Sequence, residues 1–138
     1  MQIFCLAANN NESTPTSSLL CDFMQHISTK LASAIEKKFR AYQALNDIYT
    51  CNSLKILNPK IWGYKGTIYK LRVDSGKESA RILFMRDKNK DIIVLHAFLK
   101  KTRKTPKKDA DIAMQNFTAA CNGANLQSLF TEKYFCAA

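Results

Sequence analysis

The chain has 138 residues, 46% of them hydrophobic, which suits one compact domain over residues 1–138 and requires neither disulfides nor a metal to complete its core. Its formal charge of +10 is concentrated between Lys55 and Lys108, because residues 1–54 balance and residues 109–138 carry a net negative charge. This clustering excludes an even enrichment for solubility and predicts a polyanionic partner, with nucleic acid favoured over an anionic membrane surface.

The sequence offers no grouping of side chains at metal-ligand spacing. The five cysteines form no C-x-x-C pair, and the two histidines, His26 and His96, stand far apart. We therefore expect apolar, reduced cysteines, no metal and no cofactor. The N-terminal "MQIFCLAANNN" lacks the basic and apolar parts of a signal peptide, and no segment is long enough to span a membrane, so we expect a soluble, cytoplasmic protein.

The first half of the chain predicts two helices after a segment, Gln2 to Ala7, that could form a short strand. Thr14 as N-cap and Pro15 at the first helical position start the first helix, and Ser28 or Thr29 starts the second. Both helices show one apolar face, which predicts an antiparallel hairpin. In the second helix this face comprises Leu31, Ile35, Phe39, Tyr42, Leu45 and Tyr49.

The second half changes to the period of strands. Three runs rich in β-branched and aromatic residues, 67–73, 81–86 and 91–98, are separated by "DSGKES" and "DKNK", which are short enough for antiparallel hairpins. Thr105 as N-cap and Pro106 then predict a helix, with Asp109 in its first turn. Its apolar face would comprise Ala110, Ala113, Met114, Phe117 and Cys121, and Gly123 can end it.

These elements predict an α+β fold in which the helix hairpin packs on a small antiparallel sheet. The sheet would be a meander of three strands, with the N-terminal strand as a further candidate, followed by a C-terminal helix. The tail, residues 121–138, has no clear period, and a short helix after Gly123 is the expectation for it.

Basic side chains gather on one face of the predicted meander. Lys70 and Arg72 are two residues apart and so point the same way, opposite Tyr69, Leu71 and Val73. Arg81 opens the next strand and can lie beside them, largely outside the core, and the run Lys100 to Lys108 would close one end. Such residues are ordinarily the solvated face of a half-buried sheet. Here their mutual repulsion favours a site that a phosphate chain neutralises.

Other candidate residues have a structural alternative. His96 lies among apolar residues, where a histidine is more often part of the core than a catalyst. Trp62 and Tyr64 could stack on a base, although packing is the more ordinary role for Trp62. Motifs for nucleotide binding or serine hydrolysis are absent, and no paired carboxylates suggest a glycosidase or a two-metal nuclease.

One part of the sequence resembles a known family. "YKLR", "RILF" and "LHAFLKKTRKTPKKD" stand where toxins of the RelE/ParE superfamily, specifically the phage-derived HigB-like branch, carry a strand ending in L-R, an R-(I/V) strand and an H-x-F-x-K-K-(T)-x-K-T-P segment. The order of the helices also agrees, so the resemblance covers roughly residues 1–120.

The resemblance implies a RelE-like toxin of a type II toxin–antitoxin pair that cuts messenger RNA, usually on the ribosome. The 2′-OH attacks the adjacent phosphate, so no metal is required, and basic side chains stabilise the transition state. The catalytic residues carried over by position are Lys70, Arg72, Arg81 and Lys101, together with His96, which shares the role of candidate general base with Lys70. The expected RNA-binding residues are Lys65, Lys100, Arg103, Lys104 and Lys107.

The sequence departs from RelE at one position, since Lys107 stands where RelE carries a tyrosine. Tyr64 or Tyr69 could substitute for it. The departure keeps two alternatives open: a ParE-like inhibitor that binds DNA gyrase, and a basic nucleic-acid-binding module without catalysis. In either toxin form, the expected partner is a cognate antitoxin, a small helix-turn-helix protein.

Overall fold

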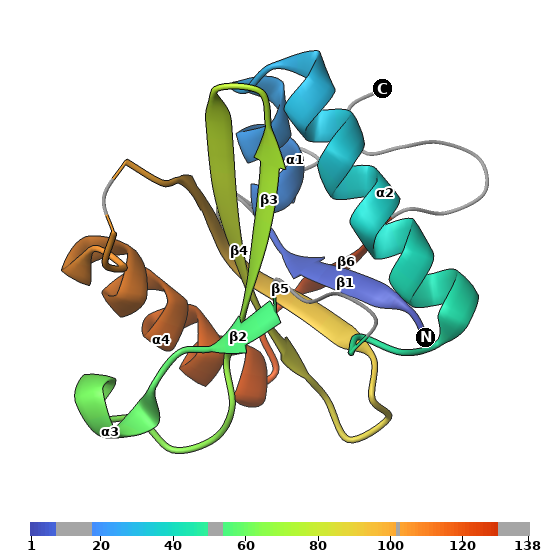
Figure 1. Cartoon of the computed structure of the whole chain (residues 1–138). Coiled ribbons are helices and arrows are strands. Elements are labelled where there is room, and N and C mark those ends of the chain that lie inside the picture. The colour runs from blue at the N-terminus through green and yellow to red at the C-terminus, as the bar shows by residue number, and fades with distance from the viewer. Residues whose placement is uncertain (8–17, 50–53, 102, 130–138) are drawn as a thin grey trace, which may run out of the picture.

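The computed structural model describes residues 1–7, 18–49, 54–101 and 103–129. Six strands form one sheet in the order β2-β3-β4-β5-β1-β6, and helices cover both of its faces (Figure 1). The fold is α+β, as predicted. The strands are β1 (Ile3–Leu6), β2 (Leu54–Ile56), β3 (Tyr69–Ser75), β4 (Glu78–Arg86), β5 (Ile92–Leu99) and β6 (Leu126–Leu129). The helices are α1 (Leu19–Gln25), α2 (Thr29–Leu45), α3 (Pro59–Trp62) and α4 (Lys107–Cys121).

The predicted meander forms the centre of the sheet. Strands β3, β4 and β5 pair antiparallel, and the candidate N-terminal strand is present as β1. The expectation of a small antiparallel sheet was wrong in two respects. The sheet is mixed, because β1 pairs parallel with β5, and the short strands β2 and β6 extend it at both edges. With only three and four residues, β2 and β6 are too short for a period to reveal them.

Helices α1 and α2 cover one face of the sheet. Helix α1 packs on β1 and β5, and α2 packs on β3 and β4. The Ser28 hydroxyl accepts a hydrogen bond from the Leu31 amide at 3.1 Å and caps α2 as predicted. Ser18 caps α1 in the same way, whereas the predicted cap, Thr14 with Pro15, lies outside the described residues.

The apolar stripe of α2 is shorter than predicted. Its first four members, Leu31 to Tyr42, are buried, but Leu45 and Tyr49 are 60% and 67% exposed. Leu45 is the last residue of α2. Asn46 adopts a left-handed conformation and ends the helix, so the helical period no longer places Tyr49 on the apolar face.

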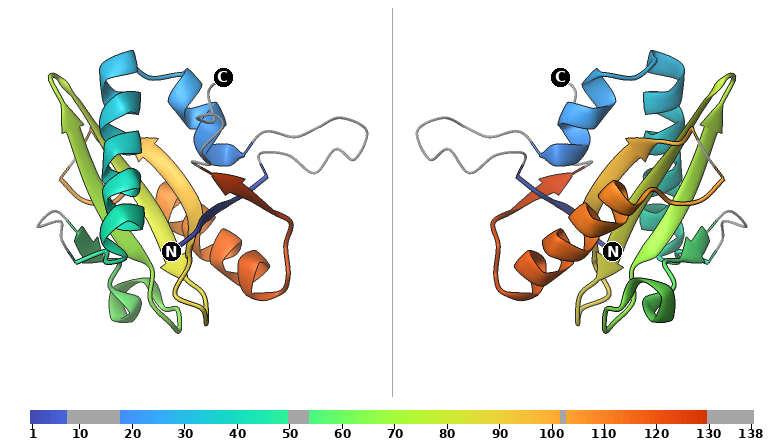
Figure 2. Two further views of the ribbon diagram at one scale, coloured as in Figure 1. Left: turned by 90° about the vertical axis from the view of Figure 1, so that its right-hand side faces the viewer. Right: turned by 90° about the vertical axis from the view of Figure 1, so that its left-hand side faces the viewer.

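Helix α4 covers the opposite face of the sheet, and Figure 2 shows it across the sheet from α2. It begins one residue later than predicted, with Pro106 as N-cap, and Thr105 makes no capping bond. Ala110 and Ala113 are buried, and Met114 and Phe117 pack beside them. Cys121 was wrongly assigned to this face: it is exposed, and Ala120 packs there instead.

Beyond α4 the structure corrects the prediction for the tail. Gly123 has a φ of 85° and follows the end of the helix, as predicted. The expected short helix is replaced by β6, whose residues Leu126–Leu129 pair antiparallel with β1. Residues 130–138 lie outside the described part of the chain.

Two further expectations concern burial and membranes. Cys5 and Cys21 are buried, and burial raises the pKa of the Cys5 thiol to about 12, which agrees with a role as an apolar side chain. Cys51 and Cys136 are outside the described residues. Within the described part of the chain, no helix is long and apolar enough to cross a membrane.

Candidate functional site

The site is built around two arginines on neighbouring strands. Arg72 of β3 and Arg81 of β4 lie directly opposite each other in the antiparallel register. Their side chains share the face of the sheet that carries α4, because Leu71, Val73 and Ile82 point into the core beneath α2. We call these two residues the guanidinium pair.

The two arginines differ in exposure. The Arg72 side chain is 58% exposed, whereas Arg81 is only 9% exposed, so the expectation that Arg81 lies largely outside the core was wrong. The reason is its place on β4, a central strand whose residues are buried on both faces of the sheet. Burial, and secondarily the charge of Arg72, lower the pKa of Arg81 from its usual range.

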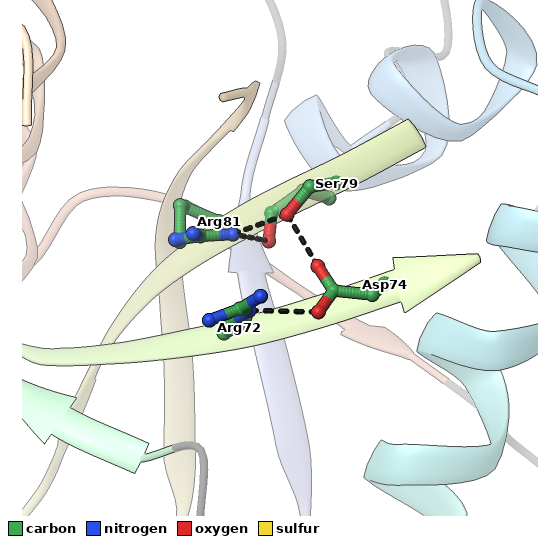
Figure 3. Close-up of polar contacts among 5 residues, drawn as sticks. Arg72, Asp74, Ser79 and Arg81 are labelled. Atoms are coloured by element: carbon green, nitrogen blue, oxygen red, sulfur yellow. Dashed lines mark hydrogen bonds and ion pairs between the residues drawn. The ribbon is translucent and has the colours of Figure 1, made fainter. Parts of the chain in front are cut away.

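A chain of hydrogen bonds links the pair through Asp74 and Ser79. These two residues also lie opposite each other, each two positions from the arginine on its own strand. Arg72 Nε donates to Asp74 Oδ2 at 2.7 Å, and the Ser79 hydroxyl donates to Asp74 Oδ1. Arg81 Nη1 donates to Ser79 Oγ at 2.6 Å and to the Ala80 carbonyl at 3.0 Å (Figure 3). The bonds from Ser79 and then Arg72 hold the pKa of Asp74 below its usual range.

The guanidinium pair lines a hollow whose other lining side chains are mostly positively charged. One part, of about 440 Å³, is lined by Lys55, Arg72, Ser79, Arg81, Lys100, Lys101 and Arg103. A second part, of about 320 Å³, shares five of these residues and adds Lys70 and Asp74. We call both parts together the cationic hollow. Among the described residues that line it, Asp74 is the only acidic one.

Two lysines of the cationic hollow have perturbed pKa values. Lys70 Nζ donates to the Thr105 hydroxyl at 2.9 Å, and its pKa is lowered by burial first and then by the charges of Lys100, Arg81 and Lys55. The pKa of Lys100 is likewise lowered by burial and then by neighbouring cations. Both amines are therefore more easily deprotonated than ordinary surface lysines, which makes them suited to proton transfer.

The structure brings most of the predicted site residues together, and it separates His96 from them. Lys70, Arg72, Arg81, Lys100, Lys101 and Arg103 all line the cationic hollow. His96 lines a different hollow, of about 610 Å³, together with residues of α4 and the segment after it. Its Nε2 lies 2.7 Å from Asp109 Oδ1. Lys65, Lys104 and Lys107 are exposed and do not line the cationic hollow.

Three residues that line the cationic hollow, Lys55, Asp74 and Ser79, were not predicted from the sequence, and one of them is a cation. Lys55 lies on β2, opposite Lys70, and lines both parts of the cationic hollow. The only signal was its place between two apolar residues in "LKI", an alternation of three residues that is too short to predict a strand.

The aromatic candidates do not reach the cationic hollow. The Tyr64 hydroxyl donates to the Leu57 carbonyl and accepts from the Ile68 amide, and burial raises its pKa. Trp62 is partly buried and packs against the apolar cluster that includes residues of α4, as expected for the structural role. Tyr69 lies on the opposite face, where its ring stacks on Phe84 with centroids 5.2 Å apart. Among the described residues, the site therefore consists of cations, one carboxylate and hydroxyl groups.

The cationic hollow lies within the segment that carries a family match. No curated protein matches the chain. Residues 27–118, two thirds of the chain, match the family described as phage-derived protein Gp49-like (DUF891), and this segment contains all residues of the cationic hollow. The family is RelE-like and toxin-like. The chain belongs to the Gp49-like family of phage-derived proteins.

Proposed function

We propose that the protein is the toxin of a type II toxin–antitoxin system, of the HigB-like branch, and a metal-independent endoribonuclease that cuts messenger RNA, with the translating ribosome as its place of action. The observation that carries this proposal is the cationic hollow. It places two arginines, side by side, next to a lysine of lowered pKa. Membership of a toxin-like family agrees with it.

In the proposed reaction, the ribose 2′-OH attacks the adjacent phosphorus, the bond to the 5′-oxygen breaks, and a cyclic phosphate and a 5′-OH result. Arg72 and Arg81 hold the phosphate and stabilise the additional negative charge of the transition state. Lys70, when neutral, accepts the proton of the 2′-OH. Lys100, when protonated, gives a proton to the departing oxygen, and its lowered pKa makes it a better acid. Lys55, Lys101 and Arg103 bind the neighbouring phosphates.

A second function, gyrase inhibition by a ParE-like binding protein, is favoured by one observation. Neither Tyr64 nor Tyr69 lines the cationic hollow, so none of the described residues that line it is a tyrosine that could stack on a base next to the cut. The lack of a stacking group agrees with a protein that acts by binding, as a ParE-like gyrase inhibitor does, and not by cutting RNA.

The experiment that separates these functions is a brief expression in cells followed by primer extension on several messages and by gel analysis of a reporter plasmid. Ribonuclease action predicts new 5′ ends within open reading frames and normal supercoiling, whereas gyrase inhibition predicts relaxed plasmid and intact messages. Purified protein should then cut RNA, alone or on ribosomes, in the presence of a chelator. An exposed lysine outside the hollow, in the variant Lys108→Ala, provides the matched control for Arg81→Ala.

The proposed partner is a cognate helix-turn-helix antitoxin that covers the cationic hollow in the cytoplasm. Co-expression with a small neighbouring gene product should give a complex in which the segment Lys100 to Lys108 is protected from lysine-modifying reagents. Unchanged reactivity would place the partner elsewhere, for example on the N-terminal part of the chain, residues 1–54, whose charges balance.

A further inference from the structure

We propose that Asp74 and Ser79 are positioning residues, which hold the guanidinium pair in the arrangement that receives a phosphate group. Asp74, the only carboxylate among the described residues that line the cationic hollow, would then favour anion binding instead of opposing it. This inference rests on the proposed function in that it concerns the same site, but it concerns binding of the phosphate and not the cleavage step.

The first argument is that the guanidinium pair needs a restraint. Side chains directly opposite each other in an antiparallel sheet have Cβ atoms about 5 Å apart, and like charges at such positions repel. Arg72 and Arg81 occupy such positions. Long arginine side chains have many rotamers, so in the absence of a partner the two guanidinium groups would separate to reduce the repulsion.

The second argument is that Asp74 and Ser79 provide this restraint with one continuous chain of hydrogen bonds. Each carboxylate oxygen of Asp74 accepts one bond, one from Arg72 and one from Ser79. The Ser79 hydroxyl donates to Asp74 and accepts from Arg81, so the carboxylate orients the hydroxyl and the hydroxyl in turn holds the second arginine. The chain of bonds therefore needs a group with two acceptor oxygens at position 74 and a group that both donates and accepts at position 79, and a carboxylate and a hydroxyl provide these.

The third argument concerns which donors remain. Arg72 uses Nε for Asp74, and Arg81 uses Nη1 for Ser79 and the Ala80 carbonyl. A guanidinium group has five N–H donors. The two Nη groups of Arg72, and the Nε and Nη2 edge of Arg81, make none of the hydrogen bonds found in the described part of the chain. Each arginine thus keeps one two-pronged edge, which is the geometry that binds a phosphate with two parallel bonds.

Simple electrostatics gives the opposite expectation, and this makes the inference testable. If Asp74 acted only through its charge, removing that charge would strengthen the binding of RNA. If Asp74 and Ser79 position the arginines, two different substitutions should weaken binding alike. Asp74→Asn removes the charge and puts an N–H donor where an acceptor is needed. Ser79→Ala leaves the net charge unchanged and breaks the link to Arg81.

The experiment measures binding of a fluorescent six-nucleotide single-stranded RNA with 2′-O-methyl groups, which the protein cannot cleave, by anisotropy at low salt. We expect Asp74→Asn and Ser79→Ala each to bind about tenfold more weakly, the effect of losing a hydrogen bond to a charged group. Asp111→Asn, a charge removal on α4 outside the hollow, should bind as the wild type or slightly more tightly. Ser79→Thr, which keeps a hydroxyl group, should restore most of the affinity.

The inference is overturned if Asp74→Asn binds more tightly than the wild type, or if Ser79→Ala binds as the wild type does. The Asp74 side chain is 46% exposed, so the variants should melt within a few degrees of the wild type. NMR gives an independent readout: the Nε–H signal of Arg72 should be sharp in the wild type and broadened in Asp74→Asn. An equally sharp signal in the variant counts against the restraint.

Failure of the proposed function remains distinguishable from failure of this inference. A wild type that binds the modified RNA but leaves unmodified RNA and messages intact refutes the ribonuclease, while the binding comparison still decides on Asp74 and Ser79. If the wild type binds neither this RNA nor inorganic pyrophosphate at low salt, the guanidinium pair is not a phosphate site and the inference fails as well.

Discussion

His96 of β5 and Asp109 in the first turn of α4 form a direct contact, with His96 Nε2 2.7 Å from Asp109 Oδ1. Both side chains are largely buried, at 16% and 17% exposure. The sequence suggested separate roles for them, catalysis for His96 and a favourable helix-dipole charge for Asp109. The contact instead joins α4 to the sheet, and His96 lines a different hollow from the guanidinium pair.

We therefore predict that the contact between His96 and Asp109 contributes to stability and not to catalysis. Asp109→Asn should lower the free energy of unfolding by about 1 to 2 kcal/mol, because a part-buried hydrogen bond to a charged group is weakened. Denaturant titration of this variant beside Asp111→Asn, which should change stability by less than about 0.5 kcal/mol, checks the prediction. If His96→Asn kept its stability but lost all ribonuclease activity, His96 would return as a catalytic candidate.

Arg81→Ala should abolish most of the proposed activity. The loss of one preorganised donor to the reacting phosphate costs about 3 kcal/mol of barrier, on the order of a hundredfold in rate. Because Arg81 is buried and bonded to Ser79 and the Ala80 carbonyl, we also expect a loss of about 1 to 2 kcal/mol in stability.

Cleavage assays and melting curves on Arg81→Ala, Arg81→Met and Lys108→Ala test this prediction. Arg81→Met keeps an apolar stem and should recover stability without recovering activity, whereas Lys108→Ala should retain both. An Arg81→Ala variant that kept full cleavage activity and stability would contradict the assignment of Arg81 as a residue that holds the reacting phosphate.

Lys70 should make stability depend on pH in a defined direction. Its pKa is lowered in the folded state by burial and by neighbouring cations, so the folded protein binds fewer protons than the unfolded chain between the lowered pKa and the usual lysine range. Stability from this group therefore rises as the pH increases through that window. The stability of the wild type relative to Lys70→Gln should increase between neutral pH and about pH 10. A constant difference, measured by denaturant titration, would show that the Lys70 pKa is not lowered.

Binding of RNA should weaken steeply as salt increases. Each phosphate neutralised on a single strand contributes about −0.7 to the slope of log affinity against log salt. Removal of Lys55, which lines both parts of the cationic hollow, should reduce the slope by about one such step, whereas Lys88→Ala, in the β4–β5 turn, should leave it unchanged. Anisotropy titrations at several salt concentrations measure this, and a flat dependence would contradict a polyanionic partner.

Gly66 should tolerate no side chain. It has a φ of 117°, and a Cβ atom at this position would lie 2.6 Å from Cζ of Phe117 on α4. Gly66→Ala should therefore cost about 2 to 3 kcal/mol through backbone strain and displacement of the ring. Gly63→Ala, at a φ of 69° with open space around it, should cost only about 1 kcal/mol. Equal losses in thermal melts would show that Phe117 moves aside easily.

The local elements of this protein were predictable from the sequence because each depends on neighbouring residues. Ser28 caps α2, the alternation around Lys70 and Arg72 defines two faces of β3, and the hairpin turns place β4 beside it. The sequence thus placed Arg81 near Lys70 and Arg72, but it predicted a six-residue connection between the strands. The exact pairing of Arg72 with Arg81 is set by the tighter turn in which Ser75 pairs with Glu78.

Other features depended on contacts between distant segments, which no local period encodes. The parallel pairing of β1 with β5, and the addition of β6 to β1, join residues about 90 and 120 positions apart. Lys55 enters the site only because β2 extends the sheet beside β3, and Arg81 is buried only because β4 lies in the centre of the sheet.

The sequence by itself determined which residue types are available to the site and which of them share a strand face, since both depend on composition and on the two-residue period of a strand. The sequence also placed Lys100 and Arg103 near the basic strand residues, but only the tertiary structure decided that Lys55 joins them. The tertiary structure also placed His96 in a different hollow, in contact with Asp109. The physical reason is that α4 and the edge strands are held on the sheet by burial of apolar surface between segments distant in sequence. The positions of the polar side chains on these elements follow from that packing and not from their neighbours in sequence.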